Sequence, residues 1–506
     1  MLEKIIQDFK AYLERITMFG QAMSIVGFDS ETIAPAGGIA QRAKRAGFFG
    51  LEIFKMQTSS EMKGYLDGLQ PHLNELDKPL QAMYRKAKKA YDEGTKIPPE
   101  KVREFAALTE EANEAWVNAR KEDNFQKFAP YLSRIIEMSK EFLALRADEM
   151  PQGGQLYDIF LDDFEEGMTI EKYDDFFEKL KATVVPLIRQ VAASSKKIDT
   201  SFLNMKVDID TQRKISEMLA KKIGFDLNRG YIGEAPHPFC GGPDKTDVRI
   251  TTRYFETDFI SSVYSILHEC GHAIYEQNIA DDIAQTSLGS GTSMGIHESQ
   301  SRFYENIIGR SLAFWEYIAK DLIAVLPPEF ANVTPQMFYE AANASKPSLI
   351  RVEADELTYS LHVIIRYEIE KLIFAGKADV NDLPQLWRSK YQEYLGVSSP
   401  TDADGVLQDI HWSGGAFGYF PTYALGSAYA AQLLHYMKAE MDVDVLIRNG
   451  EFSKITAWLT DKIHRHGSVY TPNELMETSF GEQLNGEYFA QYLKDKFGRL
   501  YGESTC

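Results

Sequence analysis

The stretch Phe259–Asn278, which reads FISSVYSILHECGHAIYEQN, decides how the rest of this chain is interpreted. Its apolar residues recur at helical spacing, and at about 100° per residue they form a single stripe. The histidines of His268-Glu269-Cys270-Gly271-His272 fall on the opposite side. The pattern therefore predicts a helix with one face to bury and another face that presents polar groups. The stripe consists of Val263, Ile266, Leu267, Cys270 and Ile274.

An H-E-x-x-H pattern inside a helix is typical of a zinc site that carries its own base. Residues four apart share a helix face, so His268 and His272 are predicted to reach one cation. Glu269 lies beside them, where its carboxylate is expected to take a proton from the attacking water. The alternative is a solvated helix whose two histidines are satisfied without a metal, and a third ligand would weigh against it. Cys270 is interpreted as a core residue of the stripe.

A catalytic zinc needs a third protein ligand and one open position. Downstream, a Gly/Ser/Thr-rich loop runs into Ile296-His297-Glu298-Ser299-Gln300. Glu298 is the predicted third ligand, because two histidines and a glutamate form the ligand set of many metallopeptidases. His297 is the alternative ligand, and an ordinary acid in the first turn of a helix is the alternative role for Glu298. The extended three-histidine pattern is absent, since Tyr275 and Asn278 stand at its remaining positions.

Composition bounds the class of protein. The chain has 506 residues, of which 44% are hydrophobic and 25% charged, as in ordinary globular proteins. A net charge of −19 argues against nucleic acid or an anionic membrane as partner. Cys240, Cys270 and Cys506 are too few to imply a disulfide framework. The charged, helical N-terminus is unlike a signal peptide, and no apolar run would span a bilayer, so a cytoplasmic enzyme is expected.

The chain is predicted to be mainly α, with at most a small sheet. No linker or low-complexity tract divides it, so a single catalytic unit over residues 1–506 is expected, with 1 to about 150 forming part of one lobe and the site motifs within 237–423. Strand-like alternation is limited to Met205–Ile209 and Asp247–Tyr254, and Gly230–Thr252 is interpreted as a loop entering an edge strand that lines a cleft. The predicted helices are Met1–Phe19, Ile39–Lys55, Ser60–Leu69, Leu80–Gly94, Pro98–Arg120, Phe125–Glu149, Ile170–Ser195, Thr211–Gly224, Phe255–Asn278, His297–Ala324, Thr334–Ala344, Pro347–Gly376, Leu383–Leu395, Gly415–Met441, Glu451–Leu459 and Asn485–Phe497.

Within the predicted helix Pro347–Gly376, Arg351, Asp355 and His362 fall on one face. One interpretation is a structural pair between Arg351 and Asp355. The other is a guanidinium that Asp355 holds in place to bind a substrate carboxylate through two parallel hydrogen bonds.

A second polar group occurs in the segment 405–423, which reads GVLQDIHWSGGAFGYFPTY. His411, Tyr419 and Tyr423 belong to types of residue that donate hydrogen bonds to the oxyanion of a tetrahedral intermediate. The alternative is that these side chains only cap a helical turn.

Together these residues make the chain resemble the carboxypeptidase Taq family of metallocarboxypeptidases, over essentially its whole length. One departure is Phe28-Asp29-Ser30-Glu31-Thr32, which is similar to a family segment that usually begins with Trp. Six motifs in order carry the resemblance: His237-Pro238-Phe239, Asp247-x-Arg249-x-Thr251, His268-Glu269-x-x-His272, His297-Glu298-Ser299-Gln300, Ile350-Arg351-x-x-Ala354-Asp355 and Gly405-x-x-Gln408-Asp409-x-His411-Trp412.

The resemblance implies a two-lobed helical peptidase with a deep central groove. It also implies a homodimer that removes single C-terminal amino acids from peptides with broad specificity, using one zinc per subunit, with cobalt often active in relatives. It implies further roles for site residues. These are ligation by His268, His272 and Glu298, base catalysis by Glu269, substrate binding by Arg351, Arg249, His237, Asp355, Gln408 and Asp409, and transition-state stabilisation by His411, Tyr423 and, third, Tyr419.

Two alternatives remain open from the sequence. A zinc endopeptidase or dipeptidyl carboxypeptidase would use the same metal site, and the products of a peptide digest distinguish these from a carboxypeptidase. A catalytically inactive peptide-binding protein is disfavoured, because every predicted ligand and the base are present.

Overall fold

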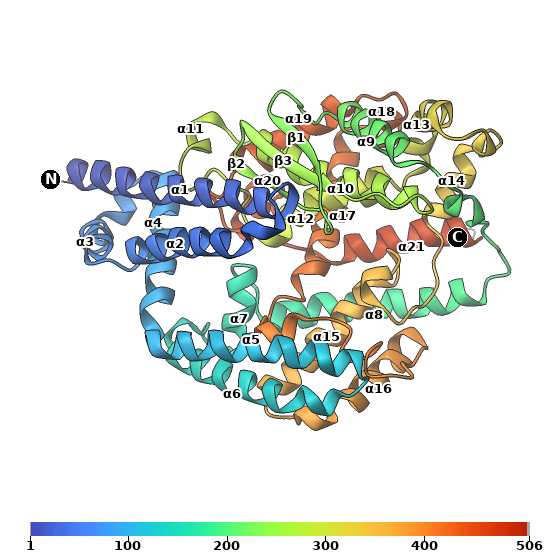
Figure 1. Cartoon of the computed structure of the whole chain (residues 1–506). Helices are drawn as coiled ribbons and strands as arrows, with labels where there is room; N and C mark the ends of the chain where they lie inside the picture. Colours follow the sequence, from blue (N-terminus) through green and yellow to red (C-terminus); the bar gives the residue numbers. More distant parts are fainter. Residues whose placement is uncertain (1, 503–506) are drawn as a thin grey trace. The chain divides into compact units, whose positions relative to one another are not determined.

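The computed structural model describes residues 2–502, so Cys506 lies outside the described part. It confirms a mainly helical chain with one small sheet (Figure 1). The chain divides into two compact units, each assembled from three separate segments. Unit 1 comprises 1–95, 199–342 and 433–483, and unit 2 comprises the remainder. Residues 1 to about 150 therefore contribute to both units. No helix among the described residues is apolar over a length that could cross a membrane.

Unit 1 contains the three-stranded sheet and the helix with the H-E-x-x-H pattern. Its elements are α1 Leu2–Thr32, α2 Ile39–Gln57, α3 Ser60–Leu69, α4 Lys78–Lys96, α9 Ile209–Ile223, β1 Gly230–Glu234, β2 Cys240–Asp244, β3 Asp247–Thr252, α10 Phe259–Gln277, α11 Asp281–Ala284, α12 Met294–Arg302, a π-helix Phe303–Ile308, α13 Leu312–Val325, α14 Pro335–Ala342, α18 Val443–Arg448, α19 Phe452–Lys462 and α20 Pro472–Phe480.

Unit 2 is built from helices alone among its described residues. Its elements are α5 Pro99–Lys121, α6 Ala129–Leu145, α7 Tyr157–Phe164, α8 Ile170–Ala193, the 3₁₀-helix Arg351–Glu353, α15 Tyr359–Phe374, α16 Leu383–Leu395, the 3₁₀-helix His411–Gly414 and α21 Glu487–Tyr501, while α17 Thr422–Glu440 begins in unit 2 and ends in unit 1.

The sheet of unit 1 has the order β1-β3-β2. β3 pairs in parallel with β1 and antiparallel with β2, so it is the central strand, and its prediction as an edge strand is wrong. β1 and β2 fall within the stretch predicted as loop, because glycines in both strands and Pro243 in β2 hide the strand pattern. α10 packs on β2 and β3, and its predicted apolar stripe is fully buried. This packing fixes one side of α10 and so orients the side that carries the histidines.

Several predicted helix boundaries are wrong, and local hydrogen bonds give the reasons. α1 continues through Phe28–Thr32, because no proline interrupts the chain before Pro35. Met205–Ile209 is not a strand, because the Asp208 side chain accepts a hydrogen bond from Thr211 N and caps α9. The segment 415–421 is a turn with positive φ at Gly415 and Gly418, so α17 starts only at Thr422.

The predicted helix Pro347–Gly376 begins only at Tyr359. The Asp355 carboxylate accepts hydrogen bonds from the backbone N–H groups of Lys346, Leu357 and Thr358. These bonds replace helical ones and hold a turn before the helix. Arg351, Asp355 and His362 therefore do not share a helix face, which contradicts the prediction. The predicted helix His297–Ala324 is also divided, into α12, the π-helix and α13.

Candidate active site

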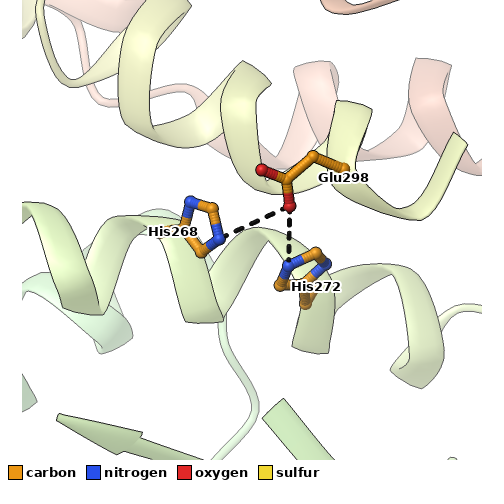
Figure 2. Close-up of side chains that lie close together, drawn as sticks. All are labelled: His268, His272 and Glu298. Atoms are coloured by element: carbon orange, nitrogen blue, oxygen red, sulfur yellow. Dashed lines mark ion pairs between the residues drawn. The ribbon is translucent and has the colours of Figure 1, made fainter. Parts of the chain in front are cut away.

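Three predicted ligands meet where α10 and α12 pack together in unit 1. His268 and His272 extend from α10 and Glu298 from α12, and their ligand atoms all lie within 4.8 Å of one another (Figure 2). Oε2 of Glu298 is 3.6 Å from Nε2 of His268 and 3.4 Å from Nε2 of His272. One carboxylate oxygen thus faces two imidazole nitrogens. Two histidine nitrogens and one carboxylate oxygen are a donor set that fits zinc with a position left for solvent or substrate.

Gly271 allows α12 to approach α10 closely beside this group. A Cβ at residue 271 would lie 2.4 Å from the backbone oxygen of Gln300 and 2.6 Å from Cα of Ser301. Only a glycine leaves this space, so the residue between the two histidines determines how near Glu298 comes to them. α12 itself begins at a defined place, because Ser293 Oγ accepts a hydrogen bond from Ile296 N.

The Glu298 carboxylate is held as an anion. Burial alone would raise its pKa, but Arg302 and the two histidines outweigh burial and hold the pKa well below the ordinary value. Nε of Arg302 donates to Oε1 at 2.8 Å, which leaves Oε2 turned toward the histidines. Burial lowers the pKa of His272 to about 3, so this ring is neutral, the form that binds metal.

The rear nitrogens of both histidines also have partners. Nδ1 of His268 lies 2.8 Å from Oε2 of Glu305, which belongs to the π-helix. Nδ1 of His272 lies 2.6 Å from Nδ1 of His297, and Nε2 of His297 lies 2.8 Å from Oε1 of Glu276. His297 is therefore not a member of the ligand group, although the sequence allowed it as a ligand.

Sequence reasoning missed Glu276 and Glu305. Glu276 stands one helical turn after His272, and this spacing could have predicted that the two side chains lie on the same helix face. Glu305 reaches His268 only because the chain forms a π-helix after α12, and no sequence pattern that we used indicates that geometry.

Glu269 is the buried carboxyl beside the two histidines, with 5% of its surface exposed. Burial raises its pKa to about 7, and His268 opposes that shift. A carboxyl with a pKa near neutral pH can both accept and return a proton, which is the behaviour of a general base and acid. His268 shows the opposite balance. Burial disfavours its charged form, but Glu298 and Glu305 outweigh burial and raise its pKa to about 9, so a cation would compete with this proton.

His237 and Arg249 lie elsewhere in unit 1. His237 is exposed in the bend between β1 and β2. Arg249 on β3 forms two hydrogen bonds with Asp247, at 2.8 and 2.5 Å, and its guanidinium lies over the ring of Phe28. The structure does not place either residue in the group around His268.

In unit 2, Arg351 pairs with Asp409 and not with Asp355. Its Nε and Nη2 donate to the two oxygens of Asp409 at 3.2 and 2.9 Å, and its Nη1 donates to Tyr359 Oη at 3.0 Å. Gln408 holds the same segment, since its Oε1 accepts from Arg351 N at 2.9 Å. The predicted contact of Arg351 with Asp355 is wrong because Asp355 is already used by the turn before α15.

Asp409 also contacts a second cation that the sequence analysis did not single out. Nη2 of Arg366 is 3.0 Å from Oδ2 of Asp409, and Arg366 is 1% exposed. Its guanidinium lies over the rings of Phe420, Trp387 and Trp412. Burial disfavours the charged form of Asp409, but the two arginines outweigh it and lower the pKa to about 2.

The rings of His411, Tyr419 and Tyr423 lie together in the structure. The His411 ring stacks on Tyr419 at 5.6 Å between centroids, and Tyr419 meets Tyr423 edge to face at 5.0 Å. Burial lowers the pKa of His411 to about 4, and Arg366 adds to the shift. Burial raises the pKa of Tyr423 above its ordinary value. At neutral pH this group therefore offers a neutral imidazole and a protonated phenol, both able to donate hydrogen bonds.

Comparisons with known proteins find similarity to carboxypeptidases over almost the whole length of the chain. Residues 8–497 match the family model described as carboxypeptidase Taq (M32) metallopeptidase. The chain is 44% identical to carboxypeptidase 1 of Bacillus subtilis (strain 168), over 98% of each chain. It is 36% identical to thermostable carboxypeptidase 1 of Thermus thermophilus, over 95% of each. The M32 carboxypeptidase structure from Deinococcus radiodurans R1 superposes with a TM-score of 0.93 at 35% identity, covering 99% of this chain and 100% of that one.

Proposed function

The chain belongs to the carboxypeptidase Taq (M32) family of metallopeptidases, and from this membership and the geometry around His268 we propose how its residues act. Its activity is that of a metallocarboxypeptidase, a peptide hydrolase that releases C-terminal residues. The roles of individual residues, the metal, the oligomeric state and the compartment are proposals.

The proposed metal is zinc, one per subunit, held by His268, His272 and Glu298, with cobalt as a substitute. The donor set of two imidazole nitrogens and one carboxylate oxygen supports this choice. When bound, such an ion acts as a Lewis acid that polarises the scissile carbonyl and acidifies water. Elemental analysis of the purified chain, with activity measured after chelation and after return of Zn²⁺ or Co²⁺, tests the proposal.

Glu269 is proposed as the general base. It accepts a proton from the attacking water and returns it to the departing amine nitrogen. The single observation that carries this role is a buried carboxyl adjacent to the ligand group, with a pKa of about 7.

We predict that Glu269→Gln lowers kcat by about 10²–10⁴-fold, because an amide cannot accept the proton. The variant should still bind one metal per chain, since Glu269 is not in the ligand set. Glu217→Gln, which changes an exposed glutamate of α9 in the same unit, is the matched control. Wild-type turnover in Glu269→Gln would refute the assignment.

Arg351 is proposed to bind the C-terminal carboxylate of the peptide. A guanidinium has five N–H groups. Asp409 and Tyr359 take three of them, one on each nitrogen, which leaves one N–H on each terminal nitrogen. Two such N–H groups suit the two oxygens of a carboxylate. Asp409 and Gln408 would then fix Arg351, Asp355 would hold the turn beside it, and Arg249 and His237 would limit how much peptide extends past the cut.

This role predicts that replacing Arg351 weakens the preference of the enzyme for a C-terminal acid over a C-terminal amide. Wild-type enzyme should prefer a peptide with a free C-terminal carboxylate to the same peptide with a C-terminal amide. Arg351→Gln should lower kcat/KM for the acid by about 10-fold or more and leave that for the amide nearly unchanged, because only the acid loses a charged hydrogen bond. An equal loss on both peptides would contradict the role.

His411 and Tyr423 are proposed to donate hydrogen bonds to the oxyanion, with Tyr419 as the third candidate. The neutral state of His411 and Tyr423 at neutral pH, in which each side chain carries a donor hydrogen, supports the proposal. Tyr423→Phe and Tyr419→Phe should separate the two phenols. The variant that loses the oxyanion contact shows a lower kcat with little change in KM, whereas the other keeps both constants.

The proposed products are single amino acids, released with broad specificity. Mass analysis of a digested peptide should show a ladder of one-residue steps from the C-terminus. Loss of dipeptides or internal cleavage would favour the alternative of a dipeptidyl carboxypeptidase or endopeptidase.

The proposed assembly is a homodimer in the cytoplasm. The family resemblance supports the dimer, and the few cysteines suit a reducing compartment. Light scattering should give twice the protomer mass of 57.4 kDa. Cell fractionation tests the compartment.

A further inference from the structure

Both ring nitrogens of His297 have partners. One partner is the candidate ligand His272, and the other is Glu276, which is not a candidate ligand. Nδ1 faces Nδ1 of His272 at 2.6 Å, and Nε2 faces Oε1 of Glu276 at 2.8 Å. The ring also packs on those of His272 and Tyr275, at centroid distances of 4.6 and 5.3 Å. Gly291 leaves the room for it, since a Cβ there would lie 2.5 Å from Cδ2 of His297.

With both imidazoles neutral and Glu276 ionised, one arrangement of protons satisfies these contacts. An ionised carboxylate only accepts hydrogen bonds, so Nε2 of His297 carries the hydrogen that Glu276 accepts. In a neutral imidazole the other nitrogen is then an acceptor, so the hydrogen in the contact between the two rings belongs to Nδ1 of His272. This leaves a lone pair on Nε2 of His272, the nitrogen that lies 3.4 Å from Glu298.

We propose that His297 and Glu276 are positioning residues that keep His272 in its Nδ1–H form and thereby set the affinity of the centre for its metal. The inference rests on the metal centre of the proposed function. The pair stands behind His272 at the place that Glu305 takes behind His268, where Oε2 of Glu305 lies 2.8 Å from Nδ1 of His268. Outer partners of ligand histidines typically change metal affinity 10- to 100-fold when they are replaced.

The two amides that can replace a histidine distinguish this role from simple packing. The side-chain oxygen of asparagine occupies the place of Nδ1 and can accept from His272, whereas the amide of glutamine reaches the place of Nε2 and cannot. His464 supplies the matched control. It is fully buried, its ring packs at 5.0 Å from Tyr275, and its Nε2 pairs with Gln300 rather than with a candidate ligand.

The measurement is the Zn²⁺ affinity of the full-length chain, by competition with a chromophoric chelator at constant pH. His297→Gln is expected to bind Zn²⁺ about 10- to 100-fold more weakly than wild type. His297→Asn should stay within about threefold of wild type, and His464→Gln should match it. The visible spectrum of the Co²⁺-loaded chain, which reports ligand geometry, should change in His297→Gln alone.

Two results would overturn the inference. One is a folded His297→Gln that binds Zn²⁺ as tightly as wild type. The other is an equal loss of affinity in the asparagine and glutamine variants, which would assign the effect to ring packing. A wild-type chain that binds no Zn²⁺ would instead overturn the proposed metal centre, and this inference with it.

Discussion

His362, in the first turn of α15, is a single residue that makes stability depend on pH. It is 1% exposed, and its Nδ1 lies 2.9 Å from Tyr391 Oη. Burial lowers its pKa to about 3, and Arg351 adds to the shift. The folded state thus keeps the ring neutral, while the unfolded chain binds a proton below a pKa of about 6.5. Between these two pKa values the unfolded state holds more protons than the folded state. The folded state therefore loses stability as the pH falls.

We therefore predict that the free energy of unfolding decreases from pH 7 to pH 5, and that His362→Gln removes about 2 kcal/mol of that decrease. Urea unfolding at both pH values measures the difference. His72→Gln is the control, since the His72 side chain is 40% exposed and not part of a core. An unchanged pH dependence in His362→Gln would show that this ring is not kept neutral.

At the scale of elements, the contact between α10 and α12 is sensitive to one methyl group. Gly271→Ala is predicted to lower the free energy of unfolding by about 1–3 kcal/mol, because its Cβ would overlap the backbone of Gln300 and Ser301. It should also weaken metal binding, since relief of the overlap moves Glu298 away from the histidines. Chemical unfolding and chelator competition measure the two effects.

Gly64→Ala is the matched control within a helix. A Cβ at Gly64 in α3 meets no atom within 4 Å. Alanine is a better helix former than glycine, so this variant should gain about 0.5–1 kcal/mol. A Gly271→Ala variant as stable and as tightly metal-bound as wild type would contradict the close approach of the two helices.

The elements that sequence could predict are those whose information is local. The predicted bounds of the helices Ser60–Leu69 and Leu383–Leu395 match the structure to the residue, because the signals at their ends are local: Ser59 caps the first, and a proline in the first turn and Gly396 bound the second. The metal pattern is likewise contained in α10. The partner of Arg351 could not be predicted, because Asp409 is distant in sequence and Asp355 is not. The second layer behind the histidines depends on how α12 and the π-helix pack, which no local pattern encodes.

At the scale of the whole molecule, the candidate metal ligands all belong to unit 1. A ligand that binds only the folded state stabilises it, by an amount that grows with the logarithm of the ligand concentration divided by Kd. We predict that Zn²⁺ raises the unfolding temperature of unit 1 and that a chelator lowers it. In scanning calorimetry, the effect of the metal on this transition should disappear in His268→Ala, which removes a candidate ligand. Metal that shifts this variant as much as wild type would contradict the assignment.

The core of unit 1 joins side chains from all three of its segments, such as Phe9 and Leu66, Ile279 and Leu288, and Val469. An expression fragment limited to 199–342 would retain every candidate ligand and yet lack the partners that bury its apolar faces. Such a fragment should be insoluble or protease-sensitive when produced alone. A minimised enzyme is therefore better sought by shortening surface loops than by excising the stretch that carries the metal motif.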